Sequence, residues 1–277
     1  MTPQALILQT AALFREVGIP DPQWDSALLL AHLTGKPALN LRLDTDTQLD
    51  DATLADFAAL RDQRMQRIPL QYLTHEQSFL GRMFYVDNRV LVPRPETELL
   101  AELAIHALRP LDAPEALDLC CGSGCIGISL ALALPAAQVH AADLSLDALA
   151  VTRRNADALD ARLTLHQGDL FAAVEGLTFD LIVSNPPYIP SEECLRLQEE
   201  VLREPGMALD GGADGYDFYR RIAMEAPAHL RPEGRLMLEV GWDQAETVAD
   251  MLRQSGFRHV CIHNDLQGIP RMVDARL

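Results

Sequence analysis

Short apolar runs separated by amphipathic stretches dominate the chain after residue 115. Five runs have the length of buried strands and alternate with helical patterns; they span residues 116–120, 139–142, 163–166, 180–183 and 235–240. Such alternation is typical of a parallel sheet covered by helices on both faces. Two more strand candidates, 260–263 and 271–275, follow a helix expected over 244–253. We therefore predict a doubly wound, mostly parallel α/β sheet that ends in an antiparallel edge pair.

The first third of the chain has helical periodicity instead. Apolar residues recur at helical spacing over 6–17 and 27–33, and a third helical pattern begins after Asp50. The pair Asp21-Pro22 offers a cap and a first-turn proline, and Gly35 offers a stop signal. No residue here suggests chemistry, so we expect a small helical domain that recognises the substrate.

Between these two regions the pattern becomes strand-like. Alternating apolar residues flank the turn signal Asp87-Asn88, which predicts a β-hairpin. The hairpin leads into Pro93-Arg94-Pro95-Glu96-Thr97-Glu98, where Glu96 or Thr97 can open the next helix. The domains we predict are a substrate-recognition domain over 1–77, a hairpin linker over 78–95 and a catalytic domain over 96–277.

Composition and charge narrow the classes of partner. With 277 residues, 48% of them hydrophobic, the chain can bury a sizeable core, and its net charge of −17 disfavours binding to DNA or RNA through phosphate contacts. The sequence has neither an apolar run long enough for a membrane span nor an N-terminal secretion signal, so we expect a cytoplasmic protein. We also expect a monomer. The cluster Cys120, Cys121 and Cys125 lacks metal-ligand spacing and favours apolar packing over a metal site.

A glycine-rich segment follows the first strand of the catalytic domain. Gly122-x-Gly124-x-x-Gly127 permits close backbone approach to a ligand at a helix N-terminus, and it fits a dinucleotide site as well as a methyltransferase cofactor loop. Asp143 ends the second strand, where it can accept hydrogen bonds from both ribose hydroxyls or else cap the next helix. After the third strand, Asp169 can bind an adenine amino group while Leu170 packs on the ring, although an ordinary Asp turn fits equally well.

The fourth strand runs directly into Asn185-Pro186-Pro187-Tyr188, beside the expected glycine loop. A planar amide or amino nitrogen offers two hydrogens, which the Asn185 side-chain oxygen and the Pro186 carbonyl can accept. The prolines hold these acceptors rigid, and Tyr188 can cover the face of the substrate group. A stiff turn without chemistry would leave Asn185 and Tyr188 unexplained, and a nucleotide dehydrogenase has no need of them.

At these residues the chain resembles the HemK/PrmC family of protein glutamine N5-methyltransferases. The resemblance spans nearly the whole chain and includes the segment Asp210-Gly211-Gly212-Ala213-Asp214-Gly215. It implies a class I, Rossmann-like methyltransferase fold, S-adenosyl-L-methionine as cofactor with S-adenosyl-L-homocysteine as product, and the glutamine of the Gly-Gly-Gln motif in class 1 peptide chain release factors as substrate. The implied cofactor contacts are Cys120, Cys121, Gly122, Ser123, Gly124, Asp143, Asp169, Leu170 and Asn185. The implied catalytic and substrate-binding residues are Asn185, Pro186, Pro187 and Tyr188.

Two residues depart from the family pattern, and three other functions compete with it. Cys120 stands where glycine is more usual, and Leu170 stands where some members are aromatic, which affects only the expected strength of cofactor binding. A sister family methylates a glutamine of a ribosomal protein, but the segment 94–98 favours the release-factor branch. An adenine-N6 methyltransferase would use the same acceptors, and the negative charge opposes it. A cofactor-binding module without activity would not require Asn185 or Tyr188.

Overall fold

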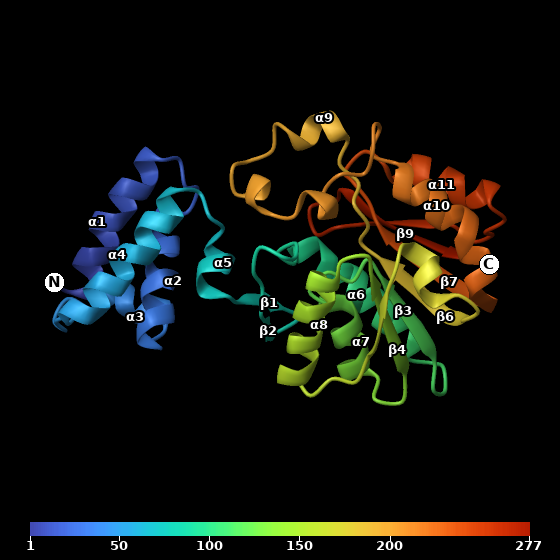
Figure 1. Cartoon of the computed structure of the whole chain (residues 1–277), viewed down its shortest axis with the longest axis horizontal. Coiled ribbons are helices and arrows are strands. Elements are labelled where there is room, and N and C mark those ends of the chain that lie inside the picture. Colours follow the sequence, from blue (N-terminus) through green and yellow to red (C-terminus); the bar gives the residue numbers. More distant parts are fainter. The chain divides into compact units, whose positions relative to one another are not determined.

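The computed structural model describes residues 1–277 as two compact units (Figure 1). The helical unit comprises Met1–Glu76 together with Gln198–Arg203, and the sheet unit comprises Gln77–Leu197 together with Glu204–Leu277. A short piece of chain from the second half of the sequence therefore belongs to the N-terminal unit.

The helical unit contains the three helices that the sequence predicts. They are α1 (Pro3–Glu16), α2 (Pro22–Thr34) and α4 (Asp51–Met65). Two further helices, α3 (Ala38–Leu43) and α5 (Leu70–Thr74), are too short to show a helical period in the sequence. The apolar faces of the helices meet in one core that includes the fully buried Phe14 and Phe57.

Local side chains and one glycine fix the ends of these helices. The Thr2 hydroxyl accepts a hydrogen bond from the Ala5 amide, and the Asp50 carboxylate accepts one from the Thr53 amide at 2.7 Å. Each such cap stabilises a helix by about 1 kcal/mol. Gly35 ends α2 in the left-handed conformation, as its sequence position predicts.

An ion-pair network holds the segment Gln198–Arg203 within the helical unit. Arg64 on α4 donates hydrogen bonds to Asp25 and to Glu200, each at 2.9 Å, and Arg67 donates to the other Glu200 oxygen at 2.6 Å. The Arg64 side chain is only 5% exposed. Because two carboxylates satisfy this buried guanidinium, Glu200 is part of the core structure of the unit.

The sheet unit is built on seven strands in the order β5-β4-β3-β6-β7-β9-β8 (Figure 1). The strands are β3 (Glu115–Leu119), β4 (Gln138–Asp143), β5 (Thr164–Gln167), β6 (Phe179–Ser184), β7 (Leu230–Glu239), β8 (Cys261–Asn264) and β9 (Pro270–Arg276). The first five are parallel, while β9 pairs antiparallel with both β7 and β8. The predicted mostly parallel sheet with an antiparallel edge is confirmed.

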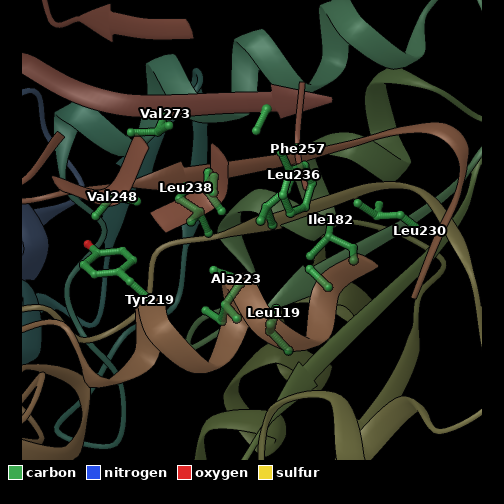
Figure 2. Close-up of a cluster of buried hydrophobic side chains, with 14 of the residues drawn as sticks. Leu119, Ile182, Tyr219, Ala223, Leu230, Leu236, Leu238, Val248, Phe257 and Val273 are labelled. Carbon is green, nitrogen blue, oxygen red and sulfur yellow. The ribbon is translucent and has the colours of Figure 1, made fainter. Parts of the chain in front are cut away.

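Helices cover both faces of this sheet. They are α6 (Pro95–Leu108), α7 (Cys125–Ala133), α8 (Leu146–Ala158), α10 (Asp217–Glu225) and α11 (Ala245–Gln254). The short helix α9 (Ser191–Cys194) has no buried residue. Single 3-10 turns lie at Leu170–Val174, Gly206–Ala208 and Ala226–His229, and a fourth, Val201–Arg203, belongs to the helical unit. Figure 2 shows the core on one face, where Tyr219 of α10, Val248 of α11 and Leu238 of β7 belong to one buried cluster. On the other face, α6 and α7 pack on a second core. None of the helices combines the length and apolar character needed to cross a membrane.

The hairpin that begins the sheet unit is shorter than its sequence pattern predicts. Strands β1 (Gln77–Phe79) and β2 (Arg82–Phe84) are joined by Leu80 and Gly81, which both have positive φ. Two positive φ angles match the twist of a tight hairpin. A turn does form at Asp87-Asn88, where the Val90 amide donates to the Asp87 carbonyl at 3.1 Å and the Asp87 carboxylate binds the amide and side chain of Arg89. It joins no strands, so the prediction that it is the turn of the hairpin is wrong. The apolar run after it forms no strand, although its residues are largely buried.

Candidate active site

A cavity of about 440 Å³ opens at the carboxyl ends of the central parallel strands. Leu119 at the end of β3 pairs with Ala142 on one side and with Ser184 on the other. The residues that follow these three positions therefore emerge side by side. The expected site residues that line the cavity are Cys120, Cys121, Gly122, Ser123, Asp143, Asp169, Leu170, Asn185 and Pro187. Gly124, Pro186 and Tyr188 do not line it.

Gly124 has a structural reason to be glycine. It is the N-terminal cap of α7 with φ +78°, and a Cβ atom there would lie 2.6 Å from Cγ2 of Thr152 on α8. The Thr152 hydroxyl in turn donates to the Gly122 carbonyl at 2.8 Å. The glycine loop is thus packed directly against α8, which fixes the backbone that faces the cavity.

Acidic side chains hold the loop from both sides. Asp143 accepts hydrogen bonds from the amides of Gly122 and Ser145, both at 2.9 Å, so it joins the ends of β3 and β4. Burial raises the pKa of Asp143, and these two hydrogen bonds oppose the rise. Asp118, inside β3, accepts from the Gly127 amide at 2.8 Å, and burial raises its pKa to about 7. The alternative role predicted for Asp143, as the cap of the next helix, belongs to Ser145, which is the N-terminal cap of α8.

The pair Asp169-Leu170 faces the cavity at the end of β5. Asp169 is half exposed and forms an ion pair with Arg221 at 2.9 Å. Leu170 is buried and packs into the core on the α10 side of the sheet while it also lines the cavity. Its φ of +48° is unusual for leucine and turns the chain sharply at this point.

The three crowded cysteines lie in the loop and at the start of α7. Cys121 and Cys125 are buried, and burial raises the pKa values of all three thiols, so they stay protonated at neutral pH. A protonated, buried thiol acts as a small apolar group. No cluster of three His, Cys, Asp or Glu side chains in the chain has the geometry to hold a metal ion.

Asn185 is the first residue beyond β6 and lies half-buried at the cavity wall. Its Nδ2 atom donates to the Thr97 hydroxyl at 3.2 Å, and the Thr97 hydroxyl donates to Glu239 at 2.7 Å. Glu239 is the last residue of β7 and is 2% exposed. Sequence reasoning missed the roles of Thr97 and Glu239, although a lone carboxylate at the end of a buried strand is itself a signal.

Tyr188 is half-buried and packs against the core cluster on the α10 side of the sheet. Burial raises the pKa of its phenol, which therefore stays neutral. Its backbone carbonyl accepts a hydrogen bond from the Gln244 side chain at 3.0 Å. The predicted contact of its ring with a substrate stays a prediction.

The segment 210–215 braces residues 185–188. Ile189 pairs with Asp210 in a parallel bridge, and the Gly211 amide donates to the Ile189 carbonyl at 2.8 Å. A Cβ atom at Gly211 would lie 2.7 Å from the Cα atom of Tyr188, so only glycine fits there without displacement. The glycines of this segment therefore let one backbone lie directly on another.

The segment 94–98 connects the site to three other parts of the sheet unit. Arg94 pairs with the buried Glu204 at 2.6 Å, Thr97 binds Glu239, and Glu98 accepts from the Leu80 amide in the hairpin. The helix begins at Pro95 with Arg94 as its cap, one or two residues earlier than predicted. Arg94, Thr97 and Glu98 thus each have a separate partner.

Comparison with known proteins agrees with this architecture. Residues 97–213 match the methyltransferase small domain, and residues 5–74 match the PrmC N-terminal domain. A solved methyltransferase from Pyrococcus furiosus superposes with a TM-score of 0.55 at 19% identity, covering 78% of this chain and 98% of that one. The fold, with its seven-stranded sheet and antiparallel edge, is that of a class I methyltransferase.

Relatives with higher identity narrow the assignment. The release factor glutamine methyltransferase of Chlorobaculum tepidum is 44% identical over 278 residues, which cover 96% of this chain and 94% of the relative. The ribosomal protein uL3 glutamine methyltransferase of Bordetella pertussis is also 44% identical, but over 230 residues that cover 81% of this chain and 77% of that relative. This chain belongs to the family of release factor glutamine methyltransferases.

Proposed function

We propose that the protein transfers a methyl group from S-adenosyl-L-methionine to the side-chain amide nitrogen of the glutamine in the Gly-Gly-Gln motif of class 1 release factors. The observation that carries the proposal is the Asn185 side chain, held by Thr97 at the wall of the cavity in a chain of this family. Its fixed amide is suited to recognise another amide.

The cavity fits S-adenosyl-L-methionine in size and charge. About 440 Å³ lies within the usual range for sites that enclose a small ligand. Four carboxylates and two guanidinium groups line it, which leaves an acidic surface suited to a cation; they are Asp143, Asp169, Asp210, Asp217, Arg89 and Arg94. S-adenosyl-L-methionine supplies an electrophilic methyl group on a positively charged sulfur.

The residues proposed to hold it lie around the glycine loop. Asp143 uses each carboxylate oxygen once for a backbone amide, and each oxygen keeps a lone pair that a ribose hydroxyl can share. Asp169 and Leu170 at the end of β5 supply a polar and an apolar surface for an adenine ring. Cys120, Cys121, Gly122 and Ser123 supply the backbone against which the ligand lies.

Asn185 and Pro186 orient the substrate in this proposal. The Asn185 Oδ1 atom and the Pro186 carbonyl accept the two hydrogens of the glutamine amide, and the fixed ring of each proline limits motion of the segment 185–188. The nitrogen lone pair is then held along the line of transfer. Methyl transfer would form the N–C bond as the S–C bond of the sulfonium breaks, and would release one N–H proton of the amide to solvent. Because this step needs little acid or base assistance, positioning supplies most of the rate enhancement. Tyr188 is proposed to cover the amide and exclude water.

The helical unit is proposed to bind the release factor away from the reacting glutamine. Its matched family model is separate from the one that covers the sheet unit, and it holds none of the residues that line the cavity. Remote binding energy of this kind positions a substrate for reaction. Removal of residues 1–76 alone would leave Glu200 without Arg64 and Arg67, so a truncated chain must also replace 198–203 with a short linker.

The test is methylation of purified substrates with labelled S-adenosyl-L-methionine. We expect methylation of a class 1 release factor, no reaction when its Gly-Gly-Gln glutamine is replaced by asparagine, and a severe loss of kcat in Asn185→Ala. Ribosomal protein uL3 must be tested as a second substrate. The uL3 glutamine methyltransferase of Bordetella pertussis is 44% identical to this chain over the region it covers, the same identity as the release factor methyltransferase of Chlorobaculum tepidum. Preferential methylation of uL3 or of DNA would overturn the proposal.

A further inference from the structure

We infer that Glu239 is a positioning residue, which acts through Thr97 to fix the direction in which the Asn185 amide faces. The inference rests on the proposed function, since it assigns the amide of Asn185 a task at the substrate. It concerns three side chains from three separate elements: Thr97 of α6 and Asn185 beyond β6, which line the cavity, and Glu239 of β7, which does not.

The direction of the hydrogen bonds follows from the carboxylate at one end. An ionised carboxylate can only accept, so the Thr97 hydroxyl must donate its single hydrogen to Glu239. The Thr97 oxygen is then free only to accept, and the group that faces it must be the NH2 of Asn185. The opposite end of the amide, Oδ1, is left for another donor.

This order decides whether Asn185 can recognise a substrate amide. With Oδ1 toward the cavity, Asn185 accepts a hydrogen from the glutamine NH2. With the amide turned over, its own NH2 would face the substrate NH2, and two donors would meet without an acceptor. Neither Asn185 nor Thr97 alone excludes the turned state, because each can both donate and accept. The carboxylate of Glu239 removes this ambiguity.

The surroundings of Glu239 decide when it is ionised. The pKa of Glu239 is raised to about 7. Burial is the largest cause and Glu96 of α6 adds to it, while the hydrogen bond from Thr97, the charge of Arg271 and the nearby Asn185 amide oppose the rise. The charge of Glu239 raises the pKa of three neighbouring groups: the phenols of Tyr188 and Tyr219 and the thiol of Cys125. The buried Tyr219 hydroxyl also donates to the Glu239 backbone carbonyl. All three stay neutral near pH 7, so Glu239 is the group that changes charge there.

Burial of the Glu239 carboxylate costs free energy of desolvation, which a neutral side chain with a purely structural role would avoid. A glutamine at the same place would fill the same volume and bind Thr97 without the charge. It would not set the direction, because a glutamine side chain can donate as well as accept. The charge is therefore the property that a purely structural role would not need.

The first test reads the Asn185 side chain directly and does not depend on activity. The chain has five asparagines, so [15N]asparagine labelling gives few side-chain amide signals, and the one lost in Asn185→Ser identifies Asn185. We expect this signal to titrate with a midpoint near the Glu239 pKa of about 7 in the wild type and to be independent of pH in Glu239→Gln. A signal that does not titrate in the wild type, or that titrates equally in Glu239→Gln, would overturn the inference.

The second test separates kcat from binding. Glu239→Gln and Thr97→Val are expected to lower kcat by about tenfold or more, as small losses of alignment do, with the affinity for S-adenosyl-L-methionine and the KM for release factor within about twofold of wild type. Thr97→Ser keeps the hydroxyl and should recover at least about tenfold over Thr97→Val. The wild-type kcat should fall as the pH drops below about 7, and this acidic limb should be reduced in Glu239→Gln to the part caused by Asp118, the other carboxyl with a pKa of about 7.

The control is Asp274→Asn on the neighbouring strand β9. Burial raises the pKa of Asp274 as well, but this carboxylate pairs with Arg235 and does not line the cavity. It should keep the wild-type kcat and the acidic limb. Wild-type kcat in both Glu239→Gln and Thr97→Val would refute the positioning role. If the wild type failed to methylate release factor while its Asn185 signal titrated with Glu239, the proposed substrate would be wrong and the positioning role would stand.

Discussion

Replacement of Gly124 by alanine tests whether the glycine loop is shaped by packing against α8. The added Cβ atom would lie 2.6 Å from Cγ2 of Thr152 and 3.2 Å from Cδ1 of Ile128. Gly176 is the matched control, because its φ of +77° equals the +78° of Gly124 within a degree and no atom lies within 4 Å of the place its Cβ would occupy. Both alanines carry the same left-handed strain of roughly 1 to 2 kcal/mol.

The difference between the two variants isolates the steric clash. Forcing an extra methyl group into a packed interior typically costs about 1 to 3 kcal/mol, so Gly124→Ala should be less stable than Gly176→Ala by that amount. Thr152→Ser removes Cγ2 but keeps the hydroxyl that donates to the Gly122 carbonyl. The effect of Thr152→Ser on the free energy of unfolding should therefore be more favourable in the Gly124→Ala background than in the wild type, by about 1 kcal/mol or more.

Native-state hydrogen exchange with mass spectrometry is the suitable assay, because peptides of β3 and β6 report the stability of the sheet unit separately from the helical unit. Equal stabilities of Gly124→Ala and Gly176→Ala would refute the packing argument. So would a Thr152→Ser effect that is the same in both backgrounds. Either result would return Gly124 to the role of a ligand contact, as its sequence motif predicts.

Three further predictions concern the carboxylates. Asp143→Ala should weaken S-adenosyl-L-methionine binding by about 1.5 to 3 kcal/mol in calorimetry, the range for hydrogen bonds to a charged group, and unchanged affinity would leave Asp143 as a brace of the loop only. Glu239 has a folded-state pKa of about 7 against 4.5 for the free side chain, so its contribution to stability is lost as the pH rises from 4.5 through 7. At about 1.4 kcal/mol per pKa unit, the free energy of unfolding of Glu239→Gln relative to that of the wild type should rise by about 3 kcal/mol between pH 4.5 and about pH 8. Urea unfolding measures this difference, and a difference that does not change with pH would contradict the raised pKa. Glu200→Gln should destabilise the helical unit by about 3 kcal/mol in hydrogen exchange, because the buried Arg64 loses a charged partner, whereas the exposed neighbour Glu199→Gln should have no effect.

The sequence predicts the elements of this protein better than the contacts between them. The seven strands, the antiparallel edge and the long helices follow from the period of apolar residues, since each pattern is local. The predicted hairpin turn is misplaced because Asp87-Asn88 forms a turn that joins no strands, while the turn of the hairpin at Leu80-Gly81 depends on a leucine with positive φ. Residue types alone do not reveal such a leucine.

The candidate site divides in the same way. Residues that follow strand ends, such as Asp143 and Asn185, can be located because parallel strands bring their carboxyl ends to one edge of the sheet. The Thr97–Glu239 hydrogen bond joins residues 142 positions apart, and the Arg64–Glu200 pair joins residues 136 positions apart. No local pattern carries such pairings, so they become visible only with the fold.

Mass spectrometry of an intact release factor, after incubation with the protein and S-adenosyl-L-methionine, measures the proposed activity without an intermediate step. We expect the mass increase of a single methyl group, located by fragmentation on the side chain of the Gly-Gly-Gln glutamine, and no increase with Asn185→Ala. An unmodified release factor, or a methyl group on any other residue, would contradict the proposed activity.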